Sequence, residues 1–360
     1  MTMQPGVPAR LLIISDAWFP QVNGVVRTLS VVVEHLRQGG DTVEVIGPDR
    51  FPTIATPGYA EIRLAMLPRR RLARLMDEFR PDAVHIATEG PLGWAARAIC
   101  LKRGWRFTTS FHTRFPDYVH ARTRIPKAWS WALMRRFHRP SSAVLVATPS
   151  LAREMEERGF PNLAPWSRGV DLDRFKPEPR APWDGLPRPV FLYAGRIAVE
   201  KNIEAFLALD LPGSKAVVGD GPQRAALQAK FPQAHFTGRL ENGKLAAAYA
   251  GADVFVFPSR TDTFGLVLLE ALAAGTPVAA YPVTGPVDVV GTAPEPVGAL
   301  DEDLRAACLK ALEADRATCR SYAEGWSWAA CAARFRETLT PADPRRAAPA
   351  VPQAATLAAD

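Results

Sequence analysis

Two cationic side chains in the second half of the sequence stand where they could bind a diphosphate. Arg196 follows a short apolar run together with Gly195, and Lys201 comes shortly afterwards, just before a helical pattern. Arginine offers a planar fork of donors and lysine a compact charge, so the pair suits phosphate oxygens. Gly195 would let the ligand approach the backbone. We predict an anion site here; surface salt bridges, for instance with Glu200, are the alternative.

Two carboxylates lie eight positions apart in the segment 258–278. Asp262 precedes a helix expected at 265–274 and could serve as its N-cap. Glu270 is the only charged residue in that helix. A carboxylate among apolar neighbours lies either on an exposed stripe or in the interior against a partner. Because a carboxylate can accept two hydrogen bonds from a vicinal diol, ribose hydroxyls are a natural ligand for Glu270.

The first apolar run of the chain, at 11–14, leads through a polar loop to Gly24, which opens a helical pattern. Free N–H groups at the start of a helix favour phosphate, although an ordinary strand–helix turn is the alternative. No G-x-G-x-x-G follows this strand, which argues against a nicotinamide dinucleotide. The sequence also lacks a legible nucleophilic triad, H-E-x-x-H motif or P-loop.

His112 follows an expected strand at 106–110, with Asp117 and Tyr118 close by in the sequence. Glu89 stands in an equivalent place after another strand. A single histidine is often structural, but polar residues at the carboxyl ends of parallel strands are the usual ligand contacts in doubly wound sheets. We therefore predict that His112 belongs to the functional site.

Short apolar runs alternate with helical patterns along the chain, and this rhythm predicts an α/β fold of two Rossmann-like, doubly wound domains that face a cleft. In the first half, strands are expected at 11–14, 42–46, 83–86, 106–110 and 143–147, with helices at 22–36, 70–79, 92–103, 127–137 and 150–158. In the second half, strands are expected at 190–193, 215–218, 234–236, 254–257 and 277–280, with helices at 203–209, 222–230, 245–250, 265–274 and 304–314.

The proline-rich stretch 173–189 is interpreted as a linker between the halves. We accordingly expect a first domain at 1–172 and a second at 173–325. A last amphipathic helix is expected at 326–340. The Ala/Pro-rich tail at 341–360 is expected to be disordered.

The composition is that of a globular protein, with 360 residues, 48% apolar and 22% charged, and a net charge of +7. No apolar run is long enough to span a bilayer. Four scattered cysteines indicate a reducing compartment and argue against structural zinc. We therefore expect a cytoplasmic protein, bound peripherally at the inner face of the cell membrane for the reason that follows.

Positive charge is concentrated in the first half, and the stretch 118–153 contains no acidic residue. This stretch could be a solvated helix face, a nucleic-acid surface or a face that docks on anionic lipid. Tryptophan favours the interfacial layer of a membrane, so we favour lipid over nucleic acid. The expected contact residues are Arg122, Arg124, Lys127, Trp129, Trp131, Arg135 and Arg136.

The ordered combination of several motifs resembles the retaining nucleotide-sugar glycosyltransferases of the GT-B fold that form glycosyltransferase family 4. These motifs lie at 21–25, 195–202, 219–222, 252–259 and 262–278. The resemblance extends over roughly 10–340. It implies that the first domain binds the acceptor, that the second binds the nucleotide sugar, and that the final helix packs back on the first domain.

The resemblance also implies a role for each candidate residue. Arg196 and Lys201 would neutralise the sugar-nucleotide diphosphate, so that neither a metal nor another cofactor is required. His112 would lie near the reacting sugar carbon. Further contacts to the donor would come from Gly24, Gly195, Arg239, Leu240, Thr263, Phe264, Gly265 and Glu270, with the backbone of 262–265 holding the transferred sugar and phosphate.

One position departs from the family pattern, in which two glutamates usually stand eight positions apart, because Asp262 replaces the first. The segment 261–265 resembles the version found in sulfolipid and other glycolipid synthases and in some bacterial mannosyltransferases.

We therefore expect transfer of a hexose, with retention, from a UDP- or GDP-sugar to a membrane lipid such as diacylglycerol. An α-mannosyltransferase acting on a phosphoinositide, glycolipid or polysaccharide precursor is the first alternative. A sugar-nucleotide 2-epimerase and a basic nucleic-acid-binding protein are alternatives from other classes.

Overall fold

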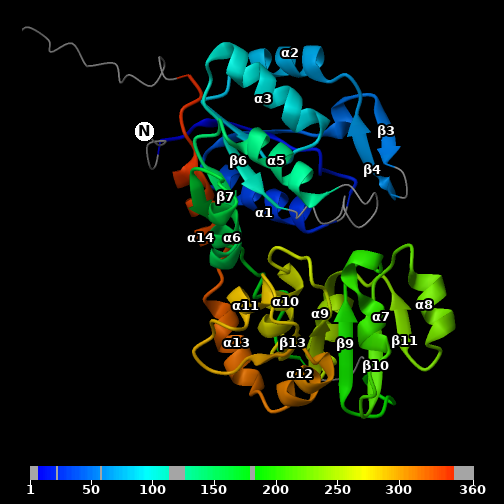
Figure 1. The fold of residues 1–360 in the computed structure, drawn as a ribbon. Coiled ribbons are helices and arrows are strands. Elements are labelled where there is room, and N and C mark those ends of the chain that lie inside the picture. The colour runs from blue at the N-terminus through cyan, green and yellow to red at the C-terminus, as the bar shows by residue number, and fades with distance from the viewer. Residues whose placement is uncertain (1–6, 22, 57–58, 113–125, 179–182, 344–360) are drawn as a thin grey trace, which may run out of the picture.

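The computed structural model describes residues 7–343 except for 22, 57–58, 113–125 and 179–182. The described chain forms two α/β domains, each built on a sheet of parallel strands. Figure 1 shows the first domain above the second. This arrangement confirms the expected fold class.

The first domain has the strand order β2-β1-β5-β6-β7-β8. Its strands are short and mostly apolar because helices cover both faces of the sheet. The strands are β1 (Arg10–Ile14), β2 (Thr42–Ile46), β5 (Ala83–Ile86), β6 (Thr108–Phe111), β7 (Val144–Val146) and β8 (Leu163–Pro165). The helices are α1 (Gly24–Gln38), α2 (Arg69–Phe79), α3 (Pro91–Arg103), α5 (Lys127–His138) and α6 (Pro149–Glu157). An antiparallel hairpin of β3 (Thr53–Thr56) and β4 (Tyr59–Ala65) lies outside this sheet.

The second domain has the strand order β11-β10-β9-β12-β13-β14. Its strands are β9 (Val190–Ala194), β10 (Ser214–Val218), β11 (His235–Gly238), β12 (Val254–Phe257), β13 (Val278–Ala280) and β14 (Gly298–Leu300). Its helices are α7 (Ile203–Leu207), α8 (Arg224–Lys230), α9 (Asn242–Gly251), α10 (Leu266–Ala273), α11 (Pro286–Val289), α12 (Leu304–Ala311) and α13 (Arg316–Glu324).

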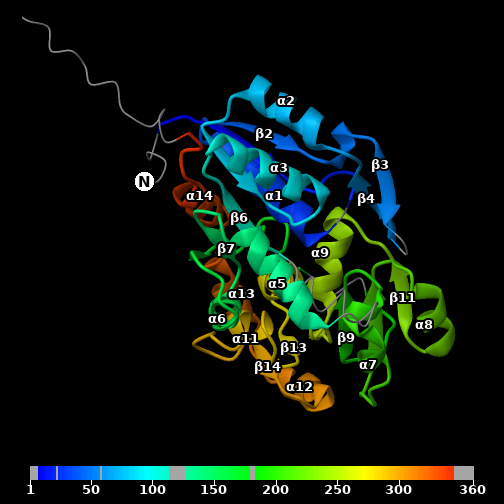
Figure 2. The same cartoon turned by 45° about the horizontal axis from the view of Figure 1, so that its top comes forward.

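The last helix, α14 (Trp328–Thr338), lies on the first domain in both views (Figures 1 and 2). Cys331 and Phe335 on α14 share a buried apolar cluster with Leu29 and Val32 of α1. The backbone N–H of Val170, where the chain leaves the first domain, donates to the carbonyl of Trp326, where it returns, at 3.1 Å. The two connections between the domains therefore run side by side.

Two expectations about the connecting and terminal segments need correction. Phe175 and Trp183, in the expected linker 173–189, lie in the apolar core of the second domain. The tail expected to be disordered from 341 onward begins as ordered chain, because the N–H of Ala342 donates to Asp82 O at 2.7 Å and Pro341 bridges to Ala83. These backbone bonds join residues 341–342 to the chain at the start of β5, an interior strand of the first sheet. Residues 344–360 lie outside the described residues.

Candidate active site

Lys201 and Asp262 come together at the carboxyl ends of two neighbouring strands. Lys201 ends a 3-10 turn that follows β9, and Asp262 lies in the loop after β12, the neighbour of β9 in the sheet. Lys201 Nζ lies 2.5 Å from Asp262 Oδ1. Asp262 Oδ2 is buried and has no hydrogen-bond partner among the described residues. Asp262 is thus not the N-cap considered above, since Gly265 takes that position.

Gly195 and Arg196 follow β9 at the same edge of the sheet. The carbonyl of Arg196 accepts a hydrogen bond of 2.7 Å from the buried hydroxyl of Tyr193. A Cβ placed at Gly219 would lie 1.8 Å from the carbonyl oxygen of Gly195, so the two loops pack backbone against backbone. This close approach requires glycine at 219, and Gly195 itself has a left-handed φ of +153°.

Glu270 is buried, at 5% exposure, and is held by residues from both domains. Arg27 Nη1 of α1 lies 3.0 Å from Glu270 Oε1, and the Tyr249 hydroxyl donates to Oε2 at 3.0 Å. Burial and then the nearby charge of Glu270 raise the pKa of Tyr249 well above its usual value, so this hydroxyl remains a donor. Of the two places considered for Glu270, the structure shows the buried one. Neither Arg27 nor Tyr249 belongs to a motif that would single it out in the sequence.

The loop 262–266 of the second domain contacts the first domain at two points. The Thr263 hydroxyl donates to the carbonyl of His112 at 2.7 Å. A Cβ at Gly24, the first residue of α1, would lie 3.8 Å from a methyl group of Leu266. The side chain of Asn23 caps α1 by accepting from the N–H groups of Val25 and Val26. The cap therefore takes two of the N–H groups that were expected to face a phosphate.

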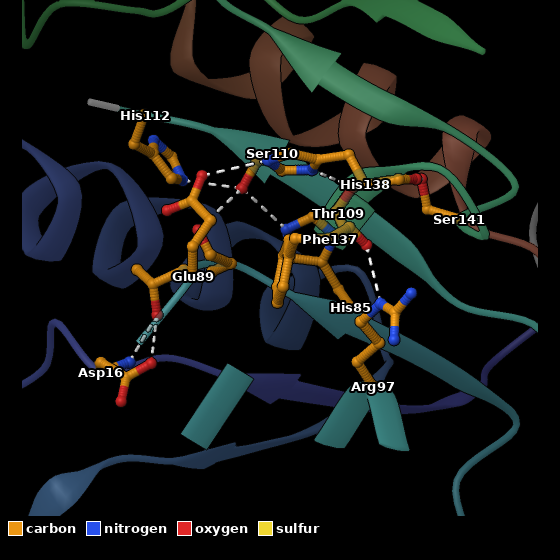
Figure 3. A network of polar contacts seen from close by, with 12 residues as sticks. Asp16, His85, Glu89, Arg97, Thr109, Ser110, His112, Phe137, His138 and Ser141 are labelled. Atoms are coloured by element: carbon orange, nitrogen blue, oxygen red, sulfur yellow. Dashed lines mark hydrogen bonds and ion pairs between the residues drawn. The ribbon is translucent and has the colours of Figure 1, made fainter. Parts of the chain in front are cut away.

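His112 is partly buried and joins a chain of polar groups that continues into the interior, shown in Figure 3. His112 Nε2 lies 2.8 Å from Ser110 Oγ, which also lies 3.1 Å from His85 Nε2, and Arg168 Nη2 approaches His112 Nδ1 at 3.4 Å. Burial lowers the pKa of His112 well below 6.5, and the positive charge of Arg168 lowers it further. His112 is therefore neutral at physiological pH.

Glu89 takes part in a second branch of this polar interior, where Oε1 lies 3.1 Å from His138 Nε2. Asp16, in the loop after β1, accepts from the N–H groups of Leu92 and Gly93 at the start of α3 and joins that helix to the loop. These contacts give Glu89 and Asp16 positioning roles in the first domain. Asp117 and Tyr118, which were expected near His112, lie outside the described residues.

Acid should destabilise the protein through His85, whose pKa burial lowers to about 3. Below pH 6.5 the unfolded chain binds a proton at this position that the folded chain does not. A histidine of this kind lowers the free energy of unfolding by about 1.4 kcal/mol for each pH unit below 6.5. Between pH 7 and pH 5 the unfolding free energy of His85→Gln should therefore fall by about 2 kcal/mol less than that of wild type. Urea unfolding at both pH values measures this difference. Equal losses of unfolding free energy in wild type and variant would contradict the prediction.

The remaining candidates lie around the same edge of the second sheet. Arg239, directly after β11, is exposed and forms an ion pair of 3.0 Å with Glu241. Leu240 packs against the apolar core. Phe264 is buried with its ring against Trp326, so only its backbone is available to a ligand. Among the described residues, no group of three or more His, Cys, Asp or Glu side chains could hold a metal ion.

Comparison with known proteins places this site in a family. Residues 22–174 match the model of Glycosyltransferase Family 4, and 188–314 match Glycosyl transferases group 1. A GDP-mannose-dependent alpha-mannosyltransferase of Mycobacterium tuberculosis is 33% identical over 78% of this chain and 81% of that protein. The chain belongs to glycosyltransferase family 4.

A further relative agrees with this assignment, and a solved structure shows the same fold. An alpha-monoglucosyldiacylglycerol synthase of Streptococcus pneumoniae is 26% identical over 76% of this chain and 71% of that protein. A solved sucrose-phosphate synthase from Thermosynechococcus elongatus has a TM-score of 0.73 at 20% identity, covering 91% of this chain and 97% of that chain. The expected resemblance is confirmed, and this family-4 glycosyltransferase is a hexosyltransferase of the GT-B fold.

Helix α5 of the glycosyltransferase carries the described part of the basic stretch. Trp129 is 76% exposed and Leu133 is 45% exposed. The exposed cations of the helix are Lys127, Arg135 and Arg136, and the exposed Arg139 follows as its C-cap.

The expectation that Trp131 also faces the membrane is wrong, because its ring is buried and stacks on Phe111. Arg122 and Arg124 lie outside the described residues. Among the helices in the described ranges, none has the length and apolar character needed to cross a bilayer.

Proposed function

We propose that this family-4 glycosyltransferase transfers a hexose from a UDP- or GDP-sugar to a membrane lipid with retention of configuration. The proposal rests on the pair of Lys201 with Asp262. The second carboxylate oxygen of Asp262 is buried and has no partner among the described residues. A buried carboxylate oxygen needs a donor, and a sugar hydroxyl supplies one. GDP-mannose is our first choice of donor, because a relative at 33% identity depends on it by name.

In the proposed reaction Arg196 and Lys201 bind the diphosphate and stabilise the charge that develops as it leaves. The bond from the anomeric carbon to the phosphate oxygen breaks, and the bond to the acceptor oxygen forms on the same face. The acceptor proton passes to the leaving phosphate oxygen, so no protein nucleophile is needed. The sugar has oxocarbenium character at the transition state, as in glycoside hydrolysis.

We give His112 a supporting part in this scheme. Its ring is neutral and contacts Ser110 and Arg168, while its carbonyl accepts from Thr263 of the second domain. His112 would therefore shape the sugar pocket at the contact between the domains rather than transfer a proton. Because two cations face the diphosphate, we propose that the reaction needs no metal ion.

The test is incubation with GDP-mannose, UDP-glucose, UDP-galactose, UDP-glucuronate or UDP-sulfoquinovose and a lipid extract, with products read by mass spectrometry. A new α-linked glycolipid, formed equally with and without EDTA, is expected. Reactions with donor alone serve as the control, because a 2-epimerase would change the donor sugar without any acceptor. Absence of a lipid product with every donor would refute the lipid acceptor.

The proposed docking of α5 on anionic membranes gives a further prediction. Replacing both Arg135 and Arg136 by Glu should weaken binding to phosphatidylglycerol vesicles at least about tenfold, since each surface cation contributes about 1 kcal/mol. Hydrolysis of soluble donor should stay within about twofold of wild type, because neither side chain lies at the donor site. Sedimentation with vesicles measures the binding.

The matched control makes the same charge change elsewhere on the first domain. Arg69 and Arg70 line a groove between α2 and α3 together with Lys102 and Arg103. Replacing Arg69 and Arg70 by Glu should weaken vesicle binding less than the α5 variant does. Equal or greater weakening by this control would show that α5 is not the docking face.

A further inference from the structure

The carboxylate of Glu270 retains acceptor capacity although both of its oxygens are already bound. Arg27 contacts Oε1 and Tyr249 contacts Oε2, each at 3.0 Å. An ionised carboxylate offers about four lone-pair sites, two on each oxygen. One site on each oxygen therefore remains, and the two suit the adjacent hydroxyls of a ribose. A carboxylate held at both oxygens cannot rotate away from a bound diol.

We propose that Arg27 is a positioning residue, which orients Glu270 for the donor ribose and aligns the first domain with the donor site. The inference rests on the proposed function, in which Glu270 binds that ribose. It adds a residue from the other domain to the recognition of the nucleotide.

The place of Arg27 in the fold supports this role. Arg27 lies on α1 one turn after Gly24, whose backbone faces Leu266 of the second domain. Its guanidinium also lies 5.5 Å from the ring centroid of Phe175, a buried residue of the second domain. Arg27 therefore contacts the second domain through a charge and through an aromatic face, and both contacts fix the start of α1 relative to α10.

If Arg27 orients Glu270 for the ribose, binding experiments give a different result than if Arg27 blocks Glu270 and must be displaced by the donor. If Arg27 blocked Glu270, its removal would tighten nucleotide binding. If Arg27 orients Glu270, its removal should selectively weaken binding of nucleotides that carry ribose hydroxyls. The ratio of affinities for a ribonucleotide and its dideoxy counterpart therefore distinguishes the two roles, whereas a general loss of packing between the domains would weaken both ligands equally.

The experiment is calorimetric titration of the full-length protein with GDP, UDP and their 2′,3′-dideoxy counterparts. We expect wild type to bind the better ribonucleotide at least about tenfold more tightly than its dideoxy form, as expected for about 1.4 kcal/mol or more from hydrogen bonds to a charged acceptor. Arg27→Gln should reduce this ratio to about threefold or less and leave the dideoxy affinity within about twofold. Arg27→Lys should give an intermediate ratio.

Two further variants separate the possible failures. Glu270→Ala should remove the discrimination entirely, and Arg50→Gln, which breaks an exposed ion pair of 2.9 Å with Glu44, should leave it unchanged. An unchanged ratio in Arg27→Gln, with loss in Glu270→Ala, would overturn the role of Arg27 and leave the ribose site standing. Full discrimination in Glu270→Ala, or none in wild type, would refute the ribose site itself. Tighter binding of the ribonucleotide by Arg27→Gln, with the dideoxy affinity unchanged, would show that Arg27 blocks Glu270 and would overturn the inference.

Discussion

Replacing Lys201 by Met should reduce kcat/KM for sugar transfer by about 10²–10³-fold, because the variant loses a cation that stabilises the departing diphosphate. The loss should fall mainly on kcat, since charge develops on the leaving group as the bond breaks. The aliphatic stem is retained, so packing beside Asp262 changes little. Initial rates with the donor and lipid identified by the panel measure the effect.

Lys215→Met is the matched control for this prediction. Lys215 is also partly buried in the second domain, where its ammonium donates to the carbonyls of Leu207 and Leu209. It lies on β10 away from the carboxyl edge, so its loss should lower stability and leave kcat/KM within about threefold. A Lys201 variant as active as this control would show that Lys201 does not face the diphosphate.

Replacing Asp262 by Asn should reduce kcat/KM by about 10²-fold or more, although the side chain keeps its size. The charge that pairs with Lys201 disappears, and an amide has a single oxygen, so it cannot place an acceptor both at the Oδ1 position beside Lys201 and at the Oδ2 position proposed for a sugar hydroxyl. Asp262→Glu, which installs the residue more usual in the family, should retain more activity than Asp262→Asn. The measurement is again initial rates at saturating lipid.

Asp253→Asn provides the comparison for Asp262. Asp253 is a similarly buried carboxylate that pairs with Arg188 at 2.7 Å, but at the amino end of β12. This variant should unfold at a lower temperature while its kcat/KM changes little. If Asp253→Asn and Asp262→Asn lost equal activity, the loss would reflect folding and not the sugar pocket.

The strands and helices of the second domain were the easiest to predict from the sequence. The apolar run at 254–257 forms β12 (Val254–Phe257), and the helix expected at 265–274 is α10 (Leu266–Ala273). Polar residues after adjacent parallel strands necessarily share one edge of the sheet. Lys201 and Asp262 could therefore be predicted together from the strand pattern and the family motifs.

Other features could not be predicted because they depend on packing between distant segments. Nothing near Glu270 in the sequence indicates that its partner is Arg27, on a helix of the other domain. The hairpin of β3 and β4 and the short strands β8 and β14 lack long apolar runs and were missed. The error at Trp131 was avoidable, because residues two apart on a helix point about 200° apart. Trp129 and Trp131 could not both have faced a membrane.

Because the chain leaves the first domain at Val170 and returns to it at Trp326, fragments that contain one domain alone are hard to define. A fragment that ended at 325 would lose α14 and expose the apolar surface of Leu29 and Val32, which Phe335 covers. The first domain is therefore discontinuous along the chain, and no single cut releases it intact. Since the two connections are joined by the bond from Val170 to Trp326, any rotation of one domain relative to the other must hinge at that place.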